Sequence, residues 1–204
     1  MNEITRISEE IIKHLNKNDV QKRKHANFWN FHKKTSKELG LFSEIFEQFQ
    51  QDSGFTIVNW GLCDSDPPDI FAELSDGSLV GIEITELVNE CAIKAQINNQ
   101  NDYYEELLRF DFDTAVNKLN EILLEKEKKL LLNKSKYNEL SLLIHTDEWL
   151  LKSEQFVDKG HEIFPKNSEI FQKVYLLFSY ESDKKKCPLI RLVWNYRLIG
   201  ETYQ

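Results

Sequence analysis

Hydrophobic and polar positions in the first third of the chain predict two helices followed by a strand. Residues 3–39 carry apolar side chains at helical spacing, and Gly40 is the expected end of this charged helix. A second, shorter helix is expected over residues 43–50, with Ser43 as its N-cap. Residues 55–60 read FTIVNW, a run typical of a strand.

The rest of the chain alternates between strand and helix patterns. Two strands joined by an Asp76-Gly77 turn are expected over residues 69–85. The further elements are a long helix from Glu86 to about Leu132, a strand over 140–146, a helical segment over 150–164, and strands over 174–180 and 189–196. Three meander strands, a crossover helix and another strand predict an α/β protein whose mixed central sheet is flanked by helices. We expect a single domain over 1–204, with a helical extension over 1–40 and a core over 43–204.

Composition narrows the class of protein without defining its function. The chain has 26 basic and 34 acidic residues, a formal charge of −8, which argues against nucleic-acid binding by net charge alone. No stretch approaches the ~18 apolar residues of a membrane-spanning helix, and the first residues lack the pattern of a secretory signal. Cys63, Cys91 and Cys187 are odd in number and far apart, which is typical of reduced thiols. The expected location is therefore the cytoplasm.

The hairpin over residues 69–85 permits a prediction of strand register. If its apolar residues share the buried face, Ile70 lies opposite Ile84 and Ala72 lies opposite Ile82. This register leaves a three-residue loop, 76–78, in which glycine commonly takes the left-handed conformation.

The opposite face of the same hairpin carries two acids. In the expected register, Asp69 lies opposite Thr85 and diagonal to Glu83, about 7–8 Å apart at the backbone. Two carboxylates and the nearby carbonyl of Ile84 would form a hard oxygen site that suits Mg²⁺ or Mn²⁺. A metal there can activate water and neutralise charge on a phosphodiester.

These residues carry a family resemblance. The pair Pro68-Asp69, a gap of thirteen residues and then Glu83-Ile84-Thr85 resembles the motif of the PD-(D/E)XK nuclease superfamily. The resemblance is good over residues 43–96 and extends to the remainder only through the order of elements. It implies a restriction-endonuclease-like core, ordered α-β-β-β-α-β, and Mg²⁺-dependent hydrolysis of phosphodiester bonds. It also implies that Asp69 and Glu83 are the metal-binding acids.

One position departs from the family motif. The third motif residue is normally a lysine that orients the attacking water, and here it is Thr85, whose hydroxyl cannot supply positive charge. Some members of the superfamily place this lysine on the following helix, where Lys94 is the candidate and Gln96 is a further polar residue. Members also often add an acid from the preceding helix, which Glu44 or Glu47 would provide here.

A basic segment near the start of the chain is a candidate nucleic-acid-binding surface, because its cations can neutralise phosphates while its aromatic rings stack. Its candidate residues are Lys22, Arg23, Lys24, Lys33 and Lys34. The alternative is an amphipathic helix whose rings pack inward and whose charges are simply solvated.

Three functions remain open from the sequence. The first is a Mg²⁺- or Mn²⁺-dependent nuclease, a DNA-binding hydrolase that could also act on RNA. The second is a catalytically inactive binding protein with the nuclease fold, such as an acidic immunity or antitoxin-like partner of a basic toxin. The third is a structural subunit of a larger restriction or defence complex.

Overall fold

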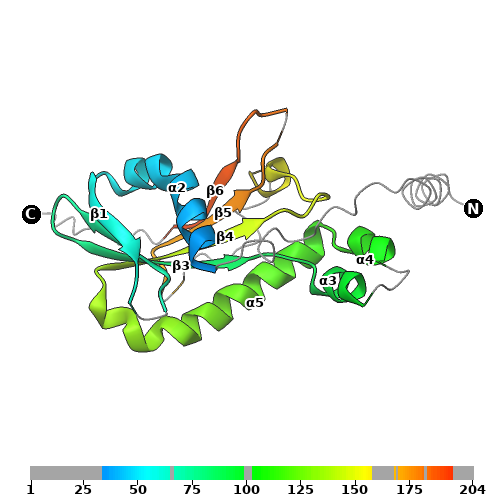
Figure 1. Cartoon of the computed structure of the whole chain (residues 1–204), viewed down its shortest axis with the longest axis horizontal. Coiled ribbons are helices and arrows are strands. Elements are labelled where there is room, and N and C mark those ends of the chain that lie inside the picture. The colour runs from blue at the N-terminus through cyan, green and yellow to red at the C-terminus, as the bar shows by residue number, and fades with distance from the viewer. Residues whose placement is uncertain are drawn as a thin grey trace, which may run out of the picture.

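The computed structural model describes residues 34–64, 67–98, 103–157, 168, 170–181 and 183–194. Its centre is a mixed six-stranded sheet with helices on both faces (Figure 1). The strands are β1 (Ile57–Leu62), β2 (Ile70–Leu74), β3 (Leu79–Glu86), β4 (Glu139–Thr146), β5 (Lys173–Phe178) and β6 (Leu189–Trp194). The helices are α2 (Lys34–Ser53), α3 (Glu90–Ile97), α4 (Tyr103–Arg109) and α5 (Phe112–Leu130), followed by the 3₁₀ segment η2 (Leu131–Lys136).

The strands lie side by side in the order in which they occur in the sequence. The first three form an antiparallel meander, β3, β4 and β5 are parallel, and β6 returns antiparallel to β5. The α3–α5 segment provides the crossover that a parallel β3–β4 connection requires. The predicted mixed sheet flanked by helices is confirmed.

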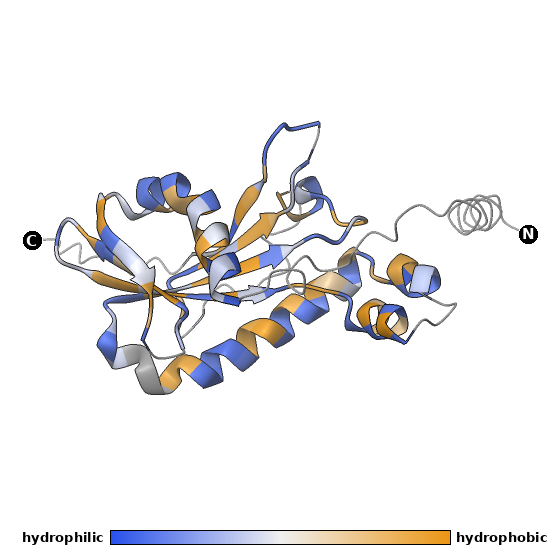
Figure 2. Ribbon diagram, in the orientation of Figure 1, coloured by the Kyte–Doolittle hydropathy of each residue, from blue (hydrophilic) through white to orange (hydrophobic). Residues whose placement is uncertain are grey.

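Successive side chains of a strand point to opposite faces of the sheet, so the hydrophobic core has two parts, one under α2 and one under α5. On one face, Ile70, Ala72 and Ile82 pack with apolar residues of α2. On the other face, Leu140 and Leu142 pack with the apolar stripe of α5, which Figure 2 shows as orange bands on a largely blue helix. The strand β4 is buried on both faces, as its continuous apolar sequence predicts.

The predicted helix end at Gly40 and the predicted helix start at Ser43 are both wrong. Helix α2 runs without interruption through Gly40, and Ser43 is not an N-cap. Its hydroxyl donates a 2.8 Å hydrogen bond to the carbonyl of Leu39, one turn earlier in the same helix. Packing of Phe42 and Phe49 against the sheet holds the helix together and outweighs the low helix propensity of glycine.

The single long helix predicted from Glu86 to Leu132 is instead three helices. Glu86 is the last residue of β3. The N-caps that start two of these helices are Asn89, which accepts a hydrogen bond from the backbone N–H of Ala92, and Asp111, which accepts one from Thr114. Such caps interrupt helical continuity where the apolar period alone does not show it.

The predicted hairpin register is also wrong, by two residues. Ile70 pairs with Ile82 and Ala72 with Val80, so the loop comprises residues 75–77. A shift of two keeps the same side chains on the buried face, so hydrophobic alternation does not distinguish the two registers. Gly77 has a φ of +83°, the left-handed conformation expected for a glycine in this loop.

Some expectations fall outside the described residues. These include the predicted N-terminal helix up to residue 33 and the last part, residues 158–164, of the helical segment predicted over 150–164. Within the described part of that segment, residues 153–157 are helical. Within the described part of the chain, no helix is both long enough and apolar enough to cross a membrane. Cys63, Cys91 and Cys187 are all free thiols.

Candidate functional site

Asp69 and Glu83 lie on neighbouring strands and are both buried. Asp69 immediately precedes β2, and the observed register, continued by one pair, places it opposite Glu83 rather than opposite Thr85. The Asp69 side chain is 3% exposed and that of Glu83 is 1% exposed. Burial, followed by the negative charge of Asp69, raises the pKa of Glu83. The corrected register therefore brings the two acids closer together than the sequence predicted.

Asp69 is fixed by contacts to both of its oxygens. Its Oδ2 accepts a 2.8 Å hydrogen bond from the backbone N–H of Ile84. Its Oδ1 accepts a 3.0 Å hydrogen bond from Nζ of Lys34, at the start of α2. The start of α2 is therefore linked directly to the edge of the β2–β3 hairpin.

A third acid joins this pair from α2, and it is neither Glu44 nor Glu47. Glu38, whose side chain is 4% exposed, lies close enough to Asp69 for the Asp69 charge to add to burial in raising its pKa. Glu44 and Glu47 are exposed on the same helix. The prediction of an acid from the preceding helix misses Glu38 because that helix is expected to start only at Ser43, whereas α2 starts at Lys34. We call Glu38, Asp69 and Glu83 the acid cluster.

Two lysines neutralise part of the charge of the acid cluster. Lys34 also lies 3.1 Å from Oε1 of Glu38, and its side chain is 54% exposed. Burial opposes the charged form of Lys34, but its hydrogen bonds to Asp69 and Glu38 outweigh this effect and raise its pKa. Lys126, from α5, lies 2.7 Å from Oε1 of Glu83 and is 17% exposed. No sequence pattern singled out Lys126 among the charged residues of its helix.

The structure does not bring Lys94 to the acid cluster. Its side chain is 72% exposed and pairs with Glu90 at 3.9 Å, while Glu90 in turn contacts Lys118 of α5. Lys118 and Lys126 are separated by eight residues, about 12 Å along the helix axis. Lys94 therefore lies toward the other end of α5.

The other site residues predicted from the sequence are Thr85, Gln96 and the basic residues near the start of the chain. Thr85 is half-buried and, by strand alternation, shares the face of Glu83. Gln96 is half-buried on α3. Of the basic residues predicted to contact nucleic acid, Lys22, Arg23, Lys24 and Lys33 lie outside the described residues, and Lys34 contacts the acid cluster as stated above.

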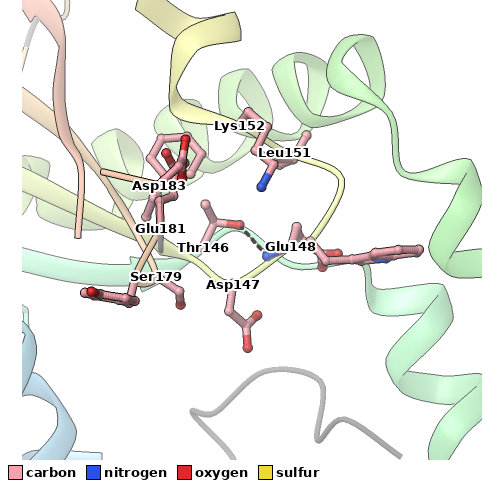
Figure 3. Close-up of a pocket in the computed structure, with 11 residues that line it drawn as sticks. Thr146, Asp147, Glu148, Leu151, Lys152, Ser179, Glu181 and Asp183 are labelled. Carbon is pink, nitrogen blue, oxygen red and sulfur yellow. Dashed lines mark hydrogen bonds between the residues drawn. The ribbon is translucent and has the colours of Figure 1, made fainter. Parts of the chain in front are cut away.

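A separate polar hollow lies where β4 and β5 end. Its volume is about 170 Å³, and its lining includes Asp147, Glu148, Lys152 and Ser179 (Figure 3). At its centre, Thr146 Oγ1 accepts a 3.3 Å hydrogen bond from the backbone N–H of Glu148, shown by the dashed line. Neither Asp69 nor Glu83 lines this hollow.

Buried polar contacts connect α2 to Ser179, which lines the hollow. Lys37, one turn of α2 from Lys34, forms an ion pair with Glu86, and burial lowers the pKa of Lys37. Nδ1 of His145 lies 3.7 Å from Oε1 of Glu86, and its Nε2 lies 3.4 Å from the hydroxyl of Ser179. These contacts hold the start of α2 against the ends of β3, β4 and β5.

The donor chemistry of the acid cluster fits a hard divalent cation. Oε2 of Glu83 is buried and has no hydrogen-bond partner among the described residues, and the buried Oε1 of Glu38 lies 3.1 Å from the amine of Lys34. Carboxylate oxygens are the ligands that Mg²⁺ and Mn²⁺ prefer. As the described side chains stand, however, no three His, Cys, Asp or Glu residues are grouped to hold a metal ion. Lysine amines lie against the cluster instead.

The acid cluster joins side chains from separate parts of the fold. The carboxylates come from three different elements, α2, the start of β2 and β3, and α5 adds a cation. Comparisons with protein-family models, curated proteins and solved structures give no match to this chain.

Proposed function

We propose that the protein is a divalent-metal-dependent nuclease with a restriction-endonuclease-like core. The observation that carries the proposal is the juxtaposition of Asp69 and Glu83 on adjacent strands, with the amine of Lys126 at 2.7 Å from Glu83. This arrangement combines two acids and a lysine, the residue types of the PD-(D/E)XK motif, although the lysine comes from the crossover helix rather than from position 85. The substrate would be the phosphodiester backbone of DNA or RNA.

Each residue of the site has a distinct proposed role. Glu38, Asp69 and Glu83 would hold Mg²⁺ or Mn²⁺, with Glu83 contributing the oxygen that Lys126 does not contact. A bound cation of this kind lowers the pKa of water and neutralises charge on the phosphodiester. Lys126 supplies the fixed positive charge that Thr85 lacks, and it holds the Glu83 carboxylate in place. The amine of Lys126 is also a hydrogen-bond donor for water beside Glu83.

The direct test is cleavage of plasmid DNA and of RNA with Mn²⁺, with Mg²⁺ and with a chelator. We expect metal-dependent cleavage that Asp69→Asn and Glu83→Gln abolish, because both variants remove a ligand charge while keeping the side-chain shape. The matched control is Glu73→Gln, since Glu73 is an exposed acid on the same hairpin. Cleavage that survives both substitutions, or that continues in the chelator, would refute the assignment.

A second candidate function is favoured by the burial of the same acids. Asp69 and Glu83 are almost fully buried and ion-paired, and the motif lysine is replaced by Thr85. These features suit an inactive binding protein with the nuclease fold, in which the acid cluster serves only structure. With its charge of −8, such a protein would act as an immunity or antitoxin-like partner of a basic toxin. Absence of cleavage with every metal, together with salt-sensitive recovery of one basic partner, would favour this alternative.

A further inference from the structure

The two lysines that contact the acid cluster differ in their freedom to move. More than half of the Lys34 side chain is exposed, whereas Lys126 is largely buried between α5 and the sheet. An exposed lysine holds an ion pair weakly, because water solvates its ammonium group well and the pair restricts a flexible side chain. Lys34 can therefore leave the cluster at a much lower cost than Lys126.

Lys34 also occupies the oxygen that a cation would need. Because Oδ2 of Asp69 accepts the hydrogen bond from Ile84, Oδ1 is the more available oxygen, and Lys34 lies 3.0 Å from it. The same amine lies 3.1 Å from Oε1 of Glu38, a buried carboxylate oxygen. A divalent cation and an ammonium group on the same two oxygens would repel each other strongly in this partly buried place.

Lys126 poses no such conflict. Its amine lies 2.7 Å from Oε1 of Glu83, whereas Oε2 is buried without a hydrogen-bond partner in the described part of the chain. Glu83 can thus offer one oxygen to a cation and keep its ion pair with Lys126 through the other.

We propose that Lys34 is an exchangeable counter-ion of the acid cluster. Its amine neutralises Asp69 and Glu38 while no metal is bound, and it withdraws to solvent when a divalent cation binds. This inference rests on the proposed metal site and adds to it a competition between one lysine and the metal. It also accounts for the unpartnered Oε2 of Glu83 in a cluster that, as its described side chains stand, is not arranged to hold an ion.

The first test is calorimetric titration of the full chain with Mn²⁺ in the absence of nucleic acid. We expect Lys34→Gln to tighten Mn²⁺ binding on the order of tenfold, because it removes a like charge within ~4 Å of the bound cation. The matched control is Lys118→Gln, which removes the same charge from an ion pair between Lys118 of α5 and Glu90 of α3. This control should leave the dissociation constant within about twofold of the wild-type value.

The outcomes separate the inference from the function on which it rests. If Glu83→Gln abolishes Mn²⁺ binding but Lys34→Gln leaves the affinity unchanged or weaker, the metal site stands and the role of Lys34 is overturned. If neither the wild type nor Lys34→Gln binds Mn²⁺, both proposals fail. Tighter binding in Lys34→Gln and Lys118→Gln alike would show only a general effect of net charge and would also overturn the inference.

A second test uses the unsubstituted protein and does not depend on the folding of any variant. Lysine acetylation is followed residue by residue by mass spectrometry, with and without saturating Mn²⁺. The amine of Lys34 should become several-fold more reactive when Mn²⁺ is present, because it loses its hydrogen bonds to the carboxylates, and Lys118 should not change. Equal reactivity of Lys34 in both conditions, at a Mn²⁺ concentration shown to saturate the site, would overturn the proposal.

Discussion

Replacing Lys126 with methionine is the most informative single perturbation of the metal-free protein. Methionine retains much of the length of the lysine stem and its apolar packing but removes the amine that lies 2.7 Å from Oε1 of Glu83. Glu83 would then be a buried carboxylate beside Asp69 without its close cation.

The expected cost follows from the burial of the pair. Removing one partner of a buried ion pair destabilises a protein by ~3–5 kcal/mol, and we expect about 3 kcal/mol because Lys126 keeps some contact with water. Protonation of Glu83 limits the cost at low pH. Its pKa is already raised, chiefly by burial, and loss of Lys126 removes a charge that lowers it. A carboxyl whose folded pKa exceeds its unfolded pKa destabilises the fold increasingly as pH rises between those two values.

The assay is urea unfolding followed by circular dichroism in chelator, at about pH 5 and about pH 8, because the raised pKa of Glu83 favours its neutral form more at the lower pH. Lys126→Met should lose clearly more stability at the higher pH, and adding Glu83→Gln should restore most of it. The control Lys128→Met, at an exposed position of the same helix, should change stability by less than ~0.5 kcal/mol. A loss below ~0.5 kcal/mol for Lys126→Met, or an equal loss at both pH values, would refute the buried-pair argument.

Three further substitutions test the fold around the site by the same urea assay. Gly40→Ala should stabilise the protein by ~1 kcal/mol, because Gly40 lies inside α2 with nothing within 4 Å of an added Cβ, and destabilisation would contradict a continuous helix. Gly81→Ala should destabilise by ~1–3 kcal/mol, because its Cβ would lie 2.8 Å from both Leu140 and Pro68, and a neutral effect would contradict the close packing of β3. Asp111→Ala should cost ~1 kcal/mol through loss of the N-cap of α5, whereas Asp111→Asn should be almost neutral, and equal losses would argue against capping.

Hydrophobic alternation is sufficient to predict which apolar residues of the β2–β3 hairpin face the core. It assigned Ile70, Ala72 and Ile82 to the same face, and all three are fully buried there. It did not fix the register, because a shift of two residues preserves every side-chain orientation. The position of the turn decides the register, and the loop over 75–77 begins one residue earlier than expected.

The acid cluster was predictable only where its residues are close in sequence. Asp69 and Glu83 belong to one hairpin, so local pairing brings them together. Glu38 and Lys126 come from helices on opposite faces of the sheet, and no local signal distinguishes either from its charged neighbours. The helix end expected at Gly40 also assigned Glu38 to a different helix from the one that precedes β1. The two are one helix because tertiary packing of α2 outweighs the low helix propensity of glycine.

The most direct test of the central claim is anomalous X-ray diffraction from crystals of the protein equilibrated with Mn²⁺. We expect one strong anomalous peak within about 2.5 Å of carboxylate oxygens of both Asp69 and Glu83, with the amine of Lys34 displaced from Asp69. A map at saturating Mn²⁺ that shows no peak between Asp69 and Glu83, and Lys34 still in contact with Asp69, would contradict the metal site.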